Sequence, residues 1–193
     1  MTQPHPEFRQ RVRALAESQW REPVVVIHLG EVKPDFDVPG RRKDGTVIGQ
    51  RLVRRFFWNL FRGTVGSLIN VVLSVAGGGV GNVFERSGKV TGPENAQALG
   101  LLDAARPADS AWLVYSPSHV AVIDSGRTFV DPKDSPPPTI LWHATTPNAP
   151  KVSIRRRISW PDGSVYEYDL TYDEAKLLKE TLRGDDPALP DRT

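Results

Sequence analysis

Cysteine is absent from this chain of 193 residues. Its absence excludes disulfide bonds, thiol nucleophiles and thiolate zinc sites. An excess of charge of one sign is also nearly absent: the formal net charge is +2, so the chain as a whole is not a general ligand for polyanions. Its content of 39% hydrophobic and 25% charged residues is typical of a globular protein with enough chain for one domain of ordinary size.

The first twenty residues lack the uninterrupted apolar stretch of a secretory signal, because several arginines and Glu7 are spread through them. We therefore expect a cytoplasmic protein. Apolar residues recur here at helical spacing, which predicts an amphipathic helix within residues 1–22 that packs on the rest of the chain. These residues are Phe8, Val12, Leu15, Ala16 and Trp20.

Residues 23–110 combine segments of very different composition. The β-branched run Val24–Leu29 predicts a buried strand. Residues 33–50 are rich in proline, glycine and aspartate, which predicts a long exposed loop. Residues 91–110 have the composition of a connector, with one short helix predicted over 94–105.

Residues 51–62, the basic segment, place apolar side chains at helical spacing with arginines on the other side, which predicts a cationic amphipathic helix. Guanidinium groups can meet anionic lipid headgroups while aromatic rings enter the membrane interface. An anionic lipid surface is therefore a candidate partner; a protein partner and an ordinary surface helix are the alternatives. Nucleic acid is not favoured, since no recognised binding motif accompanies the arginines. The predicted contact residues are Arg51, Arg54, Arg55, Phe57, Trp58, Phe61 and Arg62.

Residues 63–84, the apolar segment, contain no charged side chain. Their number suits a membrane span, but their glycines and asparagines lower the propensity for a continuous helix. Gly77 and Gly81 lie four residues apart, a spacing that lets two helices approach closely. Burial in the core, self-association and contact with a bilayer are the three ways in which this segment can be covered.

From residue 111 to 184 the chain consists of short apolar or alternating runs separated by turn residues, which predicts an antiparallel meander closed by a helix. The predicted strands are 111–116, 119–124, 128–131, 139–144, 151–160 and 164–170.

A three-residue turn over 161–163, with positive φ at Gly163, would fix the register of the last hairpin. Thr171 and Glu174 then form a capping box at the start of the amphipathic closing helix, and residues 185–193 form a disordered tail. The opposite pairs predicted from this turn are Trp160–Ser164, Ile158–Tyr166, Arg157–Glu167, Arg155–Asp169 and Ile154–Leu170.

This order of strands resembles the pleckstrin-homology-like fold of bacterial proteins. The resemblance is carried by Trp112–Asp124 (WLVYSPSHVAVID) and Ile158–Leu170 (ISWPDGSVYEYDL) with the helix that follows, and it covers residues 111–183. It implies a bent sheet of seven strands whose one end is plugged by the helix. Six strands are predicted here, and Val24–Leu29 would supply the seventh, which makes the central apolar segment an insertion. The resemblance implies a module for lipid headgroups, peptides or partner proteins, and it carries over no catalytic residue.

No catalytic, metal or cofactor site is predicted. The four histidines lack the i, i+4 spacing of a helical zinc site, although three of them lie in predicted strands and could share one face. The stretch Gly77–Asn82 lacks the lysine of a phosphate-binding loop and the third glycine of a dinucleotide fold. No Gly-x-Ser-x-Gly sequence is present for serine hydrolysis. The histidines are His5, His28, His119 and His143.

The sequence thus predicts an α+β protein with a mainly antiparallel bent sheet, a central helical glycine-rich segment and a C-terminal amphipathic helix. We expect a non-enzymatic binding or adaptor protein that is peripheral at the inner membrane surface through the basic segment. Two other functions stay open. One is a structural homo-oligomer packed through the apolar segment. The other is a small hydrolase or ligand-binding enzyme with a pocket lined by Trp112, His119, Trp142 and His143.

Overall fold

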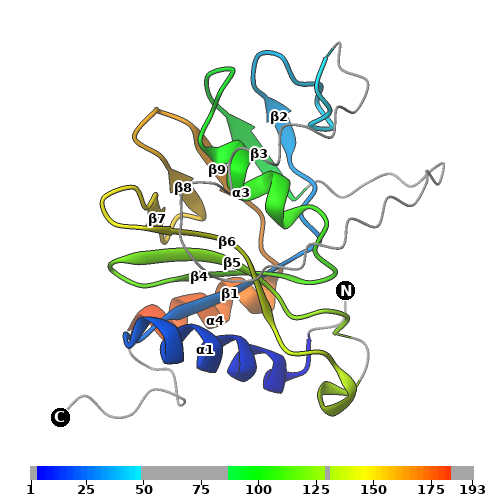
Figure 1. Ribbon diagram of the computed structural model, residues 1–193, viewed down its shortest axis with the longest axis vertical. Helices are drawn as coiled ribbons and strands as arrows, with labels where there is room; N and C mark the ends of the chain where they lie inside the picture. The colour runs from blue at the N-terminus through cyan, green and yellow to red at the C-terminus, as the bar shows by residue number, and fades with distance from the viewer. Residues whose placement is uncertain (1–3, 49–86, 129–130, 184–193) are drawn as a thin grey trace.

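The computed structural model describes residues 4–48, 87–128 and 131–183 (Figure 1). The predicted α+β class, with mainly antiparallel sheets and a C-terminal helix, is confirmed. The basic segment, the apolar segment and the tail 185–193 lie outside the described residues. The helices are α1 (Pro6–Trp20), α3 (Ala98–Ala105), α4 (Tyr172–Arg183) and the 3-10 turn η2 (Pro132–Asp134). The strands are β1 (Val25–Gly30), β2 (Asp35–Asp37), β3 (Gly88–Thr91), β4 (Ala111–Tyr115), β5 (His119–Asp124), β6 (Thr139–Thr145), β7 (Lys151–Ser153), β8 (Arg157–Ser159) and β9 (Val165–Tyr168).

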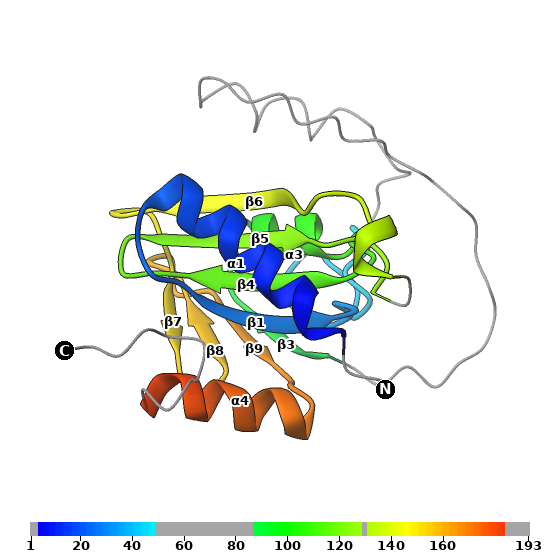
Figure 2. The same ribbon diagram turned by 90° about the horizontal axis from the view of Figure 1, so that it is seen from below.

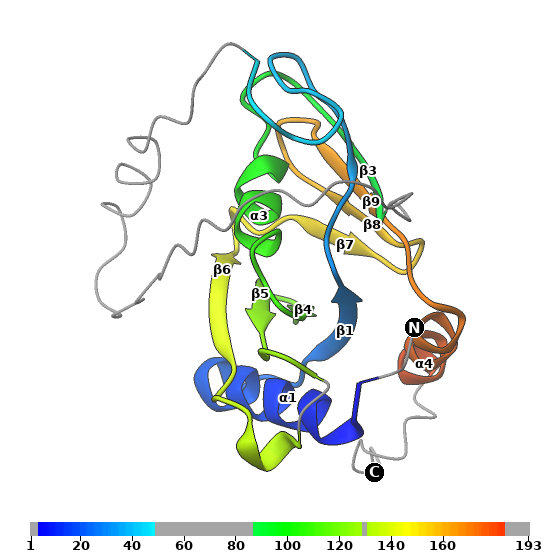
Figure 3. The same cartoon turned by 90° about the vertical axis from the view of Figure 1, so that its right-hand side faces the viewer.

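Four strands form the first sheet in the order β1-β4-β5-β6, and all neighbouring pairs are antiparallel. The strand predicted over Val24–Leu29 is confirmed as β1, which pairs with β4 and places His28 opposite Trp112. Helix α1 covers one face of this sheet, and α3 packs on the opposite face (Figures 2 and 3). Since side chains alternate along a strand, each face of the sheet has its own hydrophobic cluster.

The α1 face confirms the helical spacing of the N-terminal residues. Phe8, Val12 and Ala16 are fully buried against Trp112 and its neighbours. On the opposite face α3, the second sheet and Leu178 of α4 build the larger cluster. Burial of each large apolar side chain contributes roughly 1.5–3 kcal/mol, so these two clusters hold α1 and α3 on the sheet.

The second sheet has the order β2-β3-β9-β8-β7. Strands β2 and β3 are parallel, and the other pairs are antiparallel. Residues 49–86 connect the chain that follows β2 to the start of β3. The two strands that flank this long connection therefore lie side by side.

The exposed loop predicted over residues 33–50 is wrong for residues 34–38, which include strand β2, whereas most of the other described residues of this stretch are exposed. Phe36 and Val38 are only 4% and 5% exposed. A Cβ at Gly45, which has φ of +80°, would lie 2.5 Å from a carbon of the Phe36 ring. Arg41 donates two hydrogen bonds to Asp103 of α3, at 2.7 and 2.6 Å. Contacts with α3 thus order a segment whose composition is typical of loops.

The turn predicted over residues 161–163 is confirmed. Gly163 has φ of +82°, and its amide donates to the Trp160 carbonyl at 3.1 Å. The amide of Trp160 donates back to Ser164, at 3.0 Å. The two pairs that lie within the strands also have the predicted register: Ile158 opposite Tyr166 and Arg157 opposite Glu167.

The single strand predicted over 151–160 is wrong, because the chain reverses at residues 154–156 and forms the β7–β8 hairpin. The pairs Ile154–Leu170 and Arg155–Asp169 are wrong for the same reason. No glycine, proline, asparagine or aspartate marks this reversal. The strand predicted over 128–131 is also wrong in its described residues, since neither Thr128 nor Asp131 is extended sheet.

Candidate functional site

The residues predicted to contact a membrane or partner, Arg51 to Arg62, lie outside the described residues, and so do Gly77 and Gly81. The structure does place the chain on either side of them. The amide of Ser87 donates to the Lys33 carbonyl at 3.2 Å, and the Lys33 amide donates to the Ser87 hydroxyl. On the other side, Ile48 donates to the Gly40 carbonyl at 2.8 Å. The described residues that flank the 38-residue connection, Ile48 and Ser87, are therefore held by hydrogen bonds to Gly40 and Lys33.

The three strand histidines project from the same face of the first sheet, the one that α1 covers, but they form two separate groups. The rings of His119 and His143 stack with centroids 5.8 Å apart, and Trp20 stacks on His119 at 4.9 Å. The ring of His28 instead contacts the ring of Trp112, and the two ring centroids lie 4.5 Å apart. Among the described residues no group of three or more potential ligands is arranged to hold a metal ion.

His119 also belongs to a serine–histidine–glutamate arrangement. Ser118 Oγ lies 2.7 Å from His119 Nδ1 and donates its proton to the carboxylate of Glu22. The hydrogen bonds from Ser118 and Ser116 hold the pKa of Glu22 below its usual value. A nucleophilic serine must give its proton to the histidine, whereas here the serine can only accept from Nδ1. This geometry is that of a hydrogen-bonded turn and not of an activated nucleophile.

The pocket considered from the sequence is not assembled. Trp142 is paired with Val122 and packs against the cluster on the α3 face. Trp112 belongs to the cluster on the α1 face. The four side chains proposed to line one cavity are thus divided between the two sides of the sheet.

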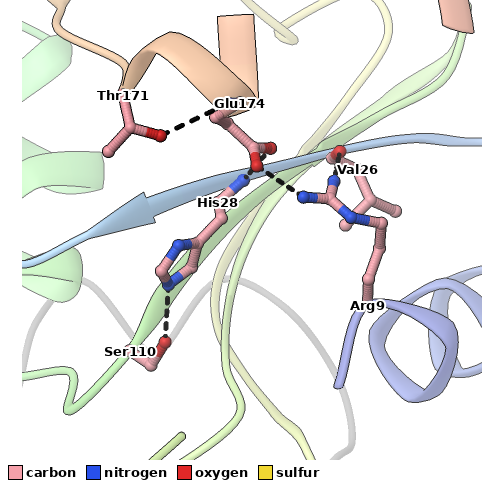
Figure 4. A network of polar contacts seen from close by, with 6 residues as sticks. All are labelled: Arg9, Val26, His28, Ser110, Thr171 and Glu174. Atoms are coloured by element: carbon pink, nitrogen blue, oxygen red, sulfur yellow. Dashed lines mark hydrogen bonds and ion pairs between the residues drawn. The ribbon is translucent and has the colours of Figure 1, made fainter. Parts of the chain in front are cut away.

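A connected group of polar residues joins α1, β1 and α4 (Figure 4). Glu174, only 5% exposed, accepts a hydrogen bond from the backbone amide of His28 at 2.8 Å and from Arg9 Nη2 at 2.5 Å. Arg9 Nη1 donates to the carbonyl of Val26 at 2.5 Å. Because β1 is an edge strand, these contacts satisfy backbone groups that no neighbouring strand pairs.

The His28 side chain completes this group from the other side. Its Nε2 lies 2.9 Å from Ser110 Oγ. Burial lowers the pKa of His28 to about 4, and the nearby Arg9 contributes in the same direction. The imidazole is therefore neutral at pH 7 and holds the start of β4 against β1, which makes the group a structural joint between α1, the first sheet and α4.

Sequence reasoning identified half of this joint. The predicted capping box is present in its first hydrogen bond, from the Glu174 amide to Thr171 Oγ1 at 3.3 Å. Its second half is replaced, because the Glu174 carboxylate bonds to α1 and β1 instead. Arg9 lies between the buried Phe8 and Val12 in the sequence of α1, and this position indicates that its side chain is directed away from solvent.

The fold thus defines an α+β protein with two sheets and a helix packed on each face of the first. Comparison of the chain with protein-family models, with curated proteins and with solved structures finds no match. No helix within the described ranges combines the length and the hydropathy needed to cross a membrane.

Proposed function

We propose that this chain is a non-enzymatic binding protein that attaches peripherally to an anionic membrane surface. The two-sheet body is the scaffold, and the basic segment, residues 51–62, is the membrane contact. The observation that carries this proposal is the place of the basic segment in the chain, between two neighbouring strands. It belongs to a connection of 38 residues between the parallel neighbours β2 and β3, with strands of both sheets before and after it.

The charges of the connection favour an anionic surface. The basic segment has four arginines and no acidic residue, and the 22 residues after it are uncharged. Each basic residue near an anionic bilayer contributes roughly 1 kcal/mol to attachment. Four of them are enough for reversible binding when aromatic side chains add contact with the interface.

The strand order supports the pleckstrin-homology-like interpretation of the scaffold. When residues 31–110 are set aside, β1, β4, β5 and β6 follow one another in a single antiparallel sheet. Strands β7, β8 and β9 follow in the second sheet, and α4 comes last. Seven strands and a terminal helix are the number that the resemblance implies. On this interpretation α1, β2, β3 and α3 are additions to a headgroup-binding or partner-binding module.

The test is sedimentation of the full chain with vesicles of two compositions. We expect binding to vesicles of phosphatidylcholine mixed with phosphatidylglycerol, and little binding to phosphatidylcholine alone. Raising the salt concentration from 0.1 to 0.5 M should release the protein, because screening shortens the range of the attraction. Equal binding to both compositions, or none to either, would reject the proposal. Light scattering of the protein alone, without vesicles, measures its oligomeric state and so tests the homo-oligomer alternative.

A further inference from the structure

The β7–β8 hairpin, residues 151–159, concentrates positive charge at the edge of the second sheet (Figure 2). Its nine residues include four basic side chains and no acidic one. All four basic residues are exposed, and within the described part of the chain none of them forms an ion pair with a carboxylate. These residues are Lys151, Arg155, Arg156 and Arg157. The whole chain has a net charge of only +2, so the hairpin itself is locally positive, with Glu167 of β9 opposite Arg157 at the base of its tip.

The tip of this hairpin is apolar. Ile154 is 67% exposed, although isoleucine is among the residues most often found inside proteins. It stands in the turn that runs from Ser153 to Arg156, where the Arg156 amide donates to the Ser153 carbonyl at 3.1 Å. An exposed aliphatic side chain at the tip is therefore followed directly in the chain by three exposed arginines.

The neighbouring β8–β9 hairpin shows what such a turn ordinarily contains. Both loops have three residues, and in both the third residue donates to the carbonyl before the loop at 3.1 Å. The β8–β9 loop has Pro-Asp-Gly, with Gly163 at φ of +82°. The β7–β8 loop has Ile-Arg-Arg, with Arg156 at φ of +60°. Glycine is favoured at this left-handed position, and a side chain there costs stability.

We propose that the tip of the β7–β8 hairpin, Ile154 to Arg157, is a second contact with an anionic bilayer. Ile154 enters the interface between headgroups and acyl chains, and the arginines around it bind the phosphates. The unfavourable backbone of Arg156 is retained because the position supplies a cation at the tip. This inference rests on the proposed function in naming the same partner, but it is carried by different residues.

A bilayer fits these residues better than nucleic acid does. Proteins that hold single strands place aromatic rings for the bases to stack on, and this loop has none. Contact with duplex phosphates would use the arginines but would leave Ile154 exposed to water or facing a charged backbone. At a membrane interface the cations and the aliphatic tip each have a partner.

The test is partitioning of the full chain onto phosphatidylglycerol-containing vesicles at 0.1 M salt. The double variant Arg155→Gln, Arg156→Gln should weaken binding about 25-fold, because each cation removed lowers the affinity about fivefold. Ile154→Ser should weaken it about tenfold, and this loss should persist at higher salt because it is not electrostatic. Arg156→Gly should weaken binding about fivefold while raising the melting temperature, since it relieves the left-handed position. Misfolding cannot produce that combination.

The matched control is Arg127→Gln with Lys133→Gln. Both side chains are exposed, and the β5–β6 connection that carries them lies away from β7 and β8 (Figures 1 and 2). The control removes the same charge and should change binding less than twofold. Hairpin variants that bind as well as this control would overturn the inference, and so would variants that lose affinity for a DNA duplex but keep it for vesicles.

The two membrane contacts can fail separately. If wild-type protein does not bind anionic vesicles, the proposed function and the hairpin contact are both wrong. If variants of the basic segment lose binding and hairpin variants do not, only the hairpin inference is overturned. If hairpin variants alone lose binding, the hairpin is the contact and the basic segment is not.

Discussion

Replacing Arg51, Arg54 and Arg55 with glutamate is expected to weaken binding to anionic vesicles by at least about 150-fold. Each arginine near the surface contributes roughly 1 kcal/mol, so loss of three cations removes about 3 kcal/mol before any repulsion by the new carboxylates is counted. Sedimentation at 0.1 M salt across a lipid titration measures this change. At 0.5 M salt the difference between variant and wild type should shrink, because both then bind weakly.

The control for this variant reverses three exposed bases of the described body, Arg127, Lys133 and Lys179. Its net charge changes by the same amount, so any common effect reports long-range repulsion alone. We expect the control to lose at most about tenfold in affinity. Unchanged melting temperatures should accompany both variants. Equal losses of vesicle affinity in the two variants would mean that the basic segment does not contact the membrane directly.

Replacing Glu174 with alanine is expected to lower the free energy of unfolding by about 3 kcal/mol. Arg9 loses the partner of its buried guanidinium, and the His28 amide loses its acceptor at 2.8 Å. Removal of one member of a buried ion pair is typically this costly because the other charge remains without compensation. For a chain of this size the melting temperature should fall by roughly 6–12 °C.

Glu180 provides the comparison on the same helix. It is 43% exposed and forms an i, i+4 pair with Lys176 at 3.9 Å. Its replacement by alanine should cost less than about 0.5 kcal/mol. A double-mutant cycle with Arg9→Ala should give a coupling energy of at least about 1 kcal/mol between Arg9 and Glu174. If Glu174→Ala were as mild as Glu180→Ala, the joint between α1, β1 and α4 would not support the fold.

Local patterns were sufficient for several elements. Helix α1 follows from the spacing of Phe8, Val12 and Ala16, and these residues are buried as predicted. The β8–β9 hairpin follows from Pro-Asp-Gly, whose glycine adopts the positive φ that fixes the register. In each case the residues that determine the structure lie within one helix or one turn of each other.

The errors arise where the determining contacts are distant or the turn residues are unusual. Phe36 lies in a stretch of loop composition, and it is buried in the same cluster as residues of α3, which begins 62 residues later. The sequence does not predict the β7–β8 reversal, because Arg156 occupies the left-handed position where glycine is expected. The tip of the β7–β8 hairpin, Ile154 to Arg157, is thus the part of the sheet that turn propensities do not predict.

The polar joint could be predicted only in part for the same reason. The capping role of Glu174 depends on Thr171, three residues away, and that hydrogen bond is present. Its ion pair with Arg9 joins residues separated by 165 positions. No periodicity links them, and the side chains meet only because α1 and α4 both pack beside β1.

The most direct test of the central claim, peripheral attachment to an anionic membrane, is fractionation of cells that express the full chain. The membrane pellet is washed first with high salt and then with detergent. We expect the protein in the pellet and its release by salt, because arginine-driven attachment is screened. Recovery wholly in the unpelleted fraction would contradict membrane attachment. Release only by detergent would contradict peripheral attachment and indicate that residues 63–84 insert into the bilayer.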